Sequence, residues 1–133
     1  MPLFLRALAA TLTVAATPVF AAGLEDEPRI TEGLITVGIA YEIAEVCPTI
    51  GPRRIRGLRY LLALKSAASD LGYSDDEIET FIDDDAAKDR LEVIARERLA
   101  GLGASRGDVA AHCRVGAAEV ANDTQVGRLL NPN

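Results

Sequence analysis

Three residues with metal-ligating or nucleophilic side chains stand out in this sequence: Cys47, His112 and Cys113. Two thiols can form a disulfide within the chain, bridge two chains, or bind a metal ion together with the imidazole. Neighbouring residues on a helix point about 100° apart, so His112 and Cys113 converge poorly on one ion. An even cysteine count favours a Cys47–Cys113 disulfide if the chain is exported, as the pattern of its first residues indicates below, with a dimer bridge and a metal site as the alternatives.

The second candidate functional feature is a basic cluster that no acidic residue interrupts between Val46 and Ser69. Its members are Arg53, Arg54, Arg56, Arg59 and Lys65. Positive charge near the start of a helix opposes the helix dipole, which suggests a reason outside the helix. The cations could pair with the acidic segment 75–89 of the same chain, bind an anion, or dock an acidic partner. The candidate partner-docking residues are Arg53, Arg54, Arg56 and Arg59.

The sequence shows no recognisable catalytic constellation. His112 is the only histidine, and its neighbour Cys113 is expected to be oxidised, so no Cys–His pair is predicted. The acidic residues between Asp70 and Asp89 lack the ligand spacing of a calcium loop and are typical of a solvated helix face. We therefore predict no enzyme activity, no cofactor and no metal ion.

The first 21 residues have the pattern of a secretory signal peptide. Arg6 precedes the apolar run 7–16, Pro18 follows it, and Val19-Phe20-Ala21 fits the small-residue cleavage rule. The apolar run is shorter than the roughly 20 residues that span a bilayer, so cleavage after Ala21 is expected rather than anchoring. No later segment is apolar enough to cross a membrane, so no integral membrane segment is expected after cleavage.

Composition limits the cellular compartments and the classes of partner that suit this chain. The formal net charge is −6, which disfavours nucleic acid and anionic lipid as partners. All but two of the 14 basic residues are Arg, and Ala is abundant, as in proteins from GC-rich bacterial genomes. Export from such a cell predicts a periplasmic protein in an oxidising compartment.

Apolar periodicity divides the rest of the chain into helices. We expect a flexible arm over 22–31 and a single helical domain over 32–133. Helices are predicted over 32–46, from Pro52 to Leu71, after the capping box that starts at Ser74, and around Leu91 to Leu99. A second capping box, 105–108, starts a helix over about 106–121, and Thr124 caps a short last helix.

The segment from Cys47 to Gly72 is expected to organise the fold. Its helix carries two interleaved apolar rows, Ile55-Leu58-Leu62 and Leu61-Leu64-Ala68-Leu71, as a central helix with several neighbours would. The prediction is an all-α, compact orthogonal bundle of about five helices without a sheet, stapled by one disulfide.

Three stretches of the chain carry a resemblance to a known group of proteins. They are CPTIGPRRIRGLRYLLALKSAASDLGYSDDEIETFI (47–82), CRVG (113–116) and QVGRLL (125–130). Together they resemble a family of small uncharacterised exported alphaproteobacterial proteins, some encoded near subunits of the respiratory NADH dehydrogenase. The resemblance covers most of the chain after residue 21, and it implies a fold and a compartment without assigning catalytic residues.

Three classes of function follow from these observations. The leading hypothesis is a non-catalytic accessory or interaction protein of the bacterial cell envelope that docks an acidic envelope protein. The second is a module that binds a small ligand or anion between its helices, and the third is an enzyme of unrecognised type.

Overall fold

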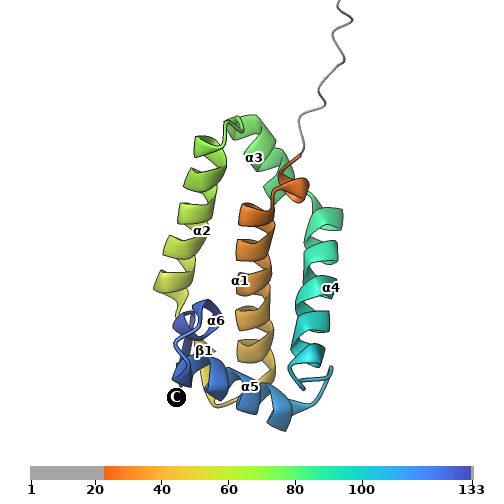
Figure 1. Ribbon diagram of the computed structural model, residues 1–133, viewed down its shortest axis with the longest axis vertical. Coiled ribbons are helices and arrows are strands. Elements are labelled where there is room, and N and C mark those ends of the chain that lie inside the picture. Colours follow the sequence, from red (N-terminus) through yellow and green to blue (C-terminus); the bar gives the residue numbers. More distant parts are fainter. Residues whose placement is uncertain (1–22, 133) are drawn as a thin grey trace, which may run out of the picture.

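The computed structural model describes residues 23–132, so the predicted signal peptide, residues 1–21, lies outside the described residues. The elements in chain order are η1 (Leu24–Asp26), α1 (Pro28–Val46), β1 (Ile50–Pro52), α2 (Arg54–Asp70), α3 (Asp75–Ile82), α4 (Asp85–Gly101), α5 (Val109–Ala121), α6 (Gln125–Arg128) and β2 (Leu130–Pro132). The predicted helical fold is confirmed, with five helices of seven residues or more and a disulfide between helices. The three longest helices lie side by side, and α5 crosses below them (Figure 1).

Helix α1, rather than α2, is the central helix of the fold. It lies between α2 and α4 (Figure 1) and buries Ile35, Ile39 and Ile43 along one row. These residues are four apart, so they share one helix face. The prediction that the helix after Cys47 is central is therefore wrong, because α2 buries only Ala67 and Ala68. The sequences of α1 and α2 both carry apolar rows at helical spacing, so the pattern alone does not show which helix is central.

The start of α1 differs from the flexible arm expected over 22–31. Residues 24–26 form a 3-10 helix, and α1 begins at Pro28, four residues before the predicted start. Proline suits the first helical position, because its missing N–H would have no intrahelical partner there. Leu24 and Ile30 are buried together with Ile78 of α3, so apolar contacts hold this segment against the domain.

Close approach to α1 is possible because two of its residues are glycines. A Cβ on Gly33 would lie 2.5 Å from Cδ2 of Leu64 on α2, and one on Gly38 would lie 3.2 Å from Cβ of Ala95 on α4. These two glycines therefore permit close packing on both sides of α1.

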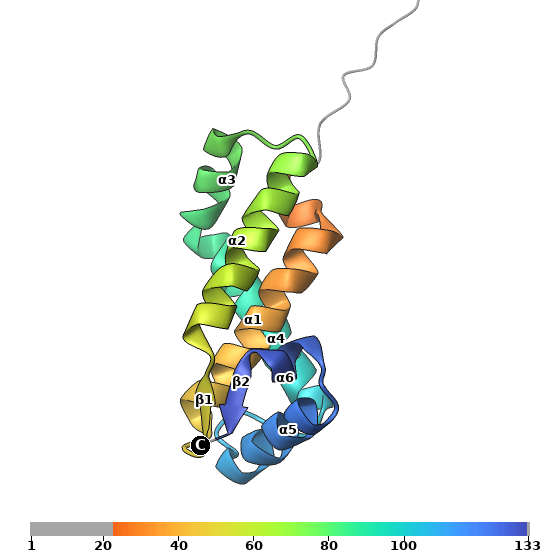
Figure 2. The ribbon, with the colours of Figure 1, turned by 90° about the vertical axis from the view of Figure 1, so that its left-hand side faces the viewer.

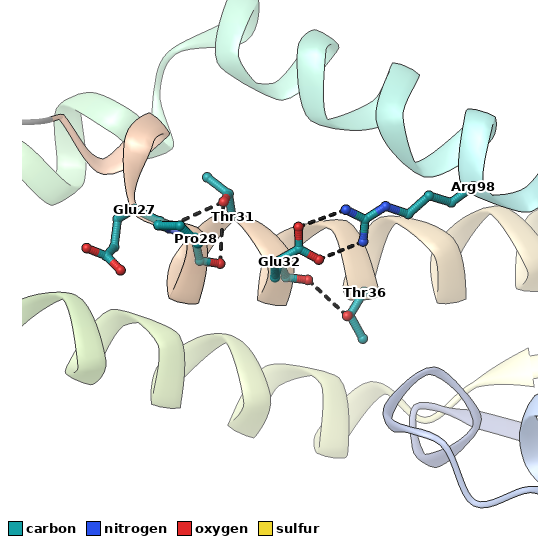
Figure 3. Close-up of polar contacts among 6 residues, drawn as sticks. All are labelled: Glu27, Pro28, Thr31, Glu32, Thr36 and Arg98. Carbon is teal, nitrogen blue, oxygen red and sulfur yellow. Dashed lines mark hydrogen bonds and ion pairs between the residues drawn. The ribbon is translucent and has the colours of Figure 1, made fainter.

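A bidentate ion pair adds to the contact between α1 and α4. In Figure 3, Arg98 reaches from α4 to Glu32 on α1, with N–O distances of 2.6 and 2.7 Å. The hydrogen bonds from Arg98 are the main cause that lowers the pKa of Glu32. Both side chains are about half exposed, so water screens the pair and its contribution to stability is small.

A small sheet that the sequence pattern did not predict joins the segment after α1 to the last described residues. β1 pairs antiparallel with β2, with Gly51 opposite Asn131, and the two strands are visible side by side in Figure 2. Each strand has three residues and contains a proline, which removes a backbone donor and masks the strand pattern. Pro52 therefore belongs to β1 and does not begin α2.

The predicted disulfide is confirmed and fastens the same end of the molecule. Cys47 follows the last residue of α1, and its sulfur is bonded to that of Cys113 on α5, with 5.1 Å between the Cα atoms. The bridge leaves neither sulfur as a free thiolate, so a Cys–His metal site and a bridge between chains are both excluded for these cysteines.

Side-chain caps set most of the helix starts. The box predicted at Ser74 is present, since Ser74 and Glu77 each accept a backbone hydrogen bond from the other residue. Thr124 caps α6, as predicted, and Asp84 caps α4. The box predicted over 105–108 is wrong, because Asp108 caps α5 through the N–H of Ala111, three residues later than predicted.

Candidate functional site

The start of α2 carries the basic cluster without any local neutralisation. Arg53 is the N-cap residue, its side chain makes no capping hydrogen bond, and the first turn holds no acidic residue. The helix dipole makes positive charge unfavourable at this end. Contacts elsewhere in the molecule must therefore explain where the guanidinium groups lie.

Two of the four candidate arginines hold the C-terminal segment. The Nε–H of Arg53 donates to the backbone oxygen of Leu130 at 2.8 Å, and Nη1 of Arg56 donates to that of Arg128 at 3.2 Å. The backbone N–H of Arg53 also donates to the oxygen of Leu129 at 2.8 Å. Leu129 and Leu130 are buried, so these bonds hold the chain where its apolar side chains enter the core.

Arg53→Gln is expected to lower the free energy of unfolding by about 2 kcal/mol. A hydrogen bond from a charged donor contributes about 1.5–3 kcal/mol, and the partly buried oxygen of Leu130 would lose its partner. Urea denaturation followed by circular dichroism measures the difference. Arg54→Gln is the matched control on the neighbouring residue, and equal losses in the two variants would contradict this role for Arg53.

The other two arginines, Arg54 and Arg59, are exposed. Within residues 23–132, neither side chain forms a hydrogen bond or an ion pair. They contribute to a shallow depression of about 530 Å³ that Pro52 and Ile55 also line. The four arginines, which form one cluster in the sequence, thus fall into two pairs in the structure. Arg53 and Arg56 hold the C-terminal segment, and Arg54 and Arg59 do not.

Pairing of the four arginines with the acidic segment 75–89 does not occur within the described part of the chain. Of the basic residues between 53 and 65, only Lys65 forms an ion pair there, with Glu79 at 2.7 Å. The pKa of Asp123 is lowered mainly by a hydrogen bond from Arg128. The nearby positive charge of Arg56 lowers it slightly further.

An apolar row runs along α2 beside these arginines, and it is exposed rather than buried in the core as its periodicity predicted. Ile55, Leu58 and Leu62 are 71%, 58% and 56% exposed, at positions i, i+3 and i+7 of the helix. Helical spacing places Arg54 and Arg59 on the two sides of this row. We call this surface the α2 face, which consists of Arg54, Ile55, Leu58, Arg59 and Leu62.

The packing of α2 explains why this row is free. The opposite side of the helix faces α1, where Tyr60 and Leu64 are partly buried and Ala67 and Ala68 are buried. Two short alanines and the contact with Gly33 let α2 approach α1 on that side only. The sequence held one sign that this row is exposed: α2 carries more apolar residues than a single neighbouring helix can cover.

His112 of α5 is buried, at 1% exposure, beside residues of α1 and α4. Its Nδ1 is 2.7 Å from the backbone oxygen of Asp108. No group of three or more His, Cys, Asp or Glu side chains in residues 23–132 is arranged to hold a metal ion. In the same part of the chain, every helix is too short or too polar to span a bilayer.

Comparison with known proteins gives one match. The model of a family described as a family of unknown function (DUF5333) matches residues 22–131. No curated protein and no solved structure matches this chain.

Proposed function

The chain belongs to this family of unknown function, and we propose that it is a non-catalytic interaction protein of the bacterial cell envelope. Its partner is an acidic protein, and the contact uses the α2 face. The observation that carries the proposal is the exposed row Ile55-Leu58-Leu62 between two arginines whose side chains find no partner among residues 23–132. Contiguous exposed apolar surface on a small domain is typical of protein interaction sites.

The chemistry of the α2 face specifies the kind of partner. An amphipathic helix can pack its apolar residues against Leu58 and Leu62, because side chains at this spacing form a continuous ridge. Carboxylates at its edges would meet Arg54 and Arg59, whose guanidinium groups bind a carboxylate through two parallel hydrogen bonds. Arginine is also enriched among the residues that dominate binding energy at interfaces.

Net charge makes the α2 face selective. The chain carries a formal charge of −6, so most of its surface repels an acidic partner. The uninterrupted basic segment at the start of α2 is the exception, and it would orient an acidic partner before contact. Arg53 and Arg56 support this surface by fixing the C-terminal segment rather than by contacting the partner.

Three observations support an envelope location. Residues 1–21 have the signal-peptide pattern, and the family match begins at residue 22, directly after the predicted cleavage site. The Cys47–Cys113 disulfide suits an oxidising compartment such as the periplasm. The resemblance to exported alphaproteobacterial proteins points the same way. N-terminal sequencing of protein from a periplasmic extract tests the location, and a retained residue 1 in the cytoplasm would contradict it.

Site-specific photo-crosslinking tests the docking proposal. A photoreactive amino acid at Leu58 is expected to crosslink an envelope protein, and one at Leu102, which is similarly exposed at the end of α4, is not. Mass spectrometry of the crosslinked peptide should identify an acidic amphipathic helix. Crosslinking from both positions, or to a basic segment, would contradict the proposal.

Charge reversal gives the quantitative test with the partner so identified. Arg54→Glu combined with Arg59→Glu is expected to weaken binding at least tenfold in calorimetry, since two attractive contacts become repulsive. The matched control reverses two exposed arginines outside the face, Arg29→Glu with Arg114→Glu, and should bind nearly as the wild type does. Equal weakening by both double variants would show that only net charge matters.

Two other occupants of the α2 face are outcomes of the same experiments. Co-sedimentation with phosphatidylglycerol vesicles that is lost in the Arg54→Glu/Arg59→Glu variant would indicate a membrane surface instead of a protein. Crosslinking of Leu58 to a second copy of the chain, with a dimer in light scattering, would indicate self-association. Either result would overturn the proposal of an acidic protein partner.

A further inference from the structure

A pocket on the other side of α1 from α2 is independent of the α2 face. It has a volume of about 310 Å³ and lies where α1, the end of α4 and the start of α5 meet. Val93, Leu99 and Ala104 supply apolar walls, and the charged side chains of Glu42, Arg96 and Arg106 border the same space. This volume is at the lower end of the range of small-molecule sites, about 300–1,000 Å³.

His112 lines this pocket and gives it a hydrogen-bond acceptor. The carbonyl oxygen of Asp108 can only accept, so the short contact at Nδ1 requires that nitrogen to carry the proton. In the neutral ring, Nε2 is then an acceptor, and no donor from residues 23–132 reaches it. A donor group of a bound molecule would therefore take the place of water at this nitrogen.

Glu42 and Arg96 add two incompletely satisfied charges. Glu42 Oε1 lies 3.5 Å from Nε of Arg96, which is too long for a good hydrogen bond, and the Glu42 side chain is only 16% exposed. Nε of Arg96 is buried and makes no hydrogen bond within the described residues. Arg96 uses Nη2 to bind Glu92 at 2.5 Å, which fixes the guanidinium at the pocket.

We propose that this pocket binds a free α-amino acid with an aliphatic side chain. Its ammonium group would donate to Glu42 and to Nε2 of His112, and its carboxylate would accept from Arg96 and Arg106. The aliphatic side chain would pack against the apolar walls. Because charges of both signs border the pocket, a zwitterion complements it better than a simple anion or cation does.

Calorimetric titration with three probes tests the proposal. L-Leucine is expected to bind, while leucinamide, which lacks the carboxylate, and 4-methylpentanoate, which lacks the amine, should each bind at least tenfold more weakly. Equal binding of leucine and either analogue would overturn the zwitterion assignment. No heat and no amide chemical-shift change at His112 or Ala104, with leucine, valine or isoleucine at about 10 mM, would overturn the site.

Variants of exposed or half-buried residues keep the test clear of folding defects. Glu42→Gln and Arg106→Gln should each weaken leucine binding at least tenfold. Glu45→Gln, on the same helix and exposed, is the matched control and should leave binding unchanged. The Arg54→Glu/Arg59→Glu variant should also bind leucine normally, and a parallel loss in it would contradict an independent pocket.

Discussion

A Cys47→Ala/Cys113→Ala variant is expected to lose about 4 kcal/mol of unfolding free energy relative to the oxidised protein. The two cysteines are 66 residues apart, so the bridge removes much of the freedom of the unfolded chain. In the native state it joins the end of α1 to α5, next to the strands that close the domain. Alanine avoids placing a hydroxyl at Cys47, which is 1% exposed.

Urea denaturation of three samples separates the bridge from the effects of substitution. The reduced wild-type protein should unfold at nearly the same urea concentration as the double alanine variant, and the oxidised protein at a clearly higher one. Coincident curves for oxidised and reduced protein would show that the disulfide contributes little. A variant much less stable than reduced wild type would assign the loss to packing around Cys47.

Local signals in the sequence predicted much of the fold. The disulfide, the end of α1 before Pro48, the capping box at Ser74 and the Thr124 cap depend on neighbouring residues or on cysteine count, and all are present. The central position of α1 could not be predicted in the same way. It depends on whether α1 or α2 has neighbouring helices on both sides. The only local signs in the sequence were Gly33 and Gly38, which let other helices approach α1 closely.

The candidate docking site was predicted in composition but not in geometry. The sequence located the arginines at the start of α2, yet the division into Arg53 and Arg56 on one side and Arg54 and Arg59 on the other depends on Arg128 of α6 and on β2. That strand is paired with β1, which lies in the first half of the chain, and three-residue strands with proline carry no periodic signal. The exposure of Leu58 follows from the same kind of long-range packing.

The two proposed sites share α1 as their support. Tyr60 and Leu64 pack α2 towards α1 on one side, and Glu42 of α1 borders the pocket on the other. α1 is fixed at its end by the disulfide and along its length by the row Ile35-Ile39-Ile43. Such a helix gives both surfaces a rigid base, which binding sites need to keep their geometry.

Gly127→Ala is expected to destabilise the protein by about 3 kcal/mol, although alanine is the better helix former. Gly127 lies in α6, and its α-carbon faces the backbone of α5. A Cβ there would overlap the carbonyl oxygen of Glu119 and lie 2.7 Å from the nitrogen of Val120. Backbone atoms of a packed helix cannot move aside as a flexible side chain can, so α6 would have to leave α5.

Displacement of α6 would have consequences beyond the substituted residue. The segment after α6 carries Leu129 and Leu130, whose backbone oxygens accept from Arg53. Moving it would expose these buried leucines and weaken the pairing of β1 with β2. We therefore expect lower protection from amide hydrogen exchange at Arg53 in Gly127→Ala, together with the lower unfolding free energy.

Gly57→Ala is the matched control, because it makes the same substitution inside another helix. A Cβ on Gly57 would have no heavy atom outside its own helix and chain neighbours within 4 Å, so only the higher helix propensity of alanine remains. The free energy of unfolding of that variant, measured by urea denaturation, should be about 0.5–1 kcal/mol higher than that of the wild type. Opposite signs at the two glycines are the expected result, and a Gly127→Ala protein as stable as the wild type would contradict the close α5–α6 contact.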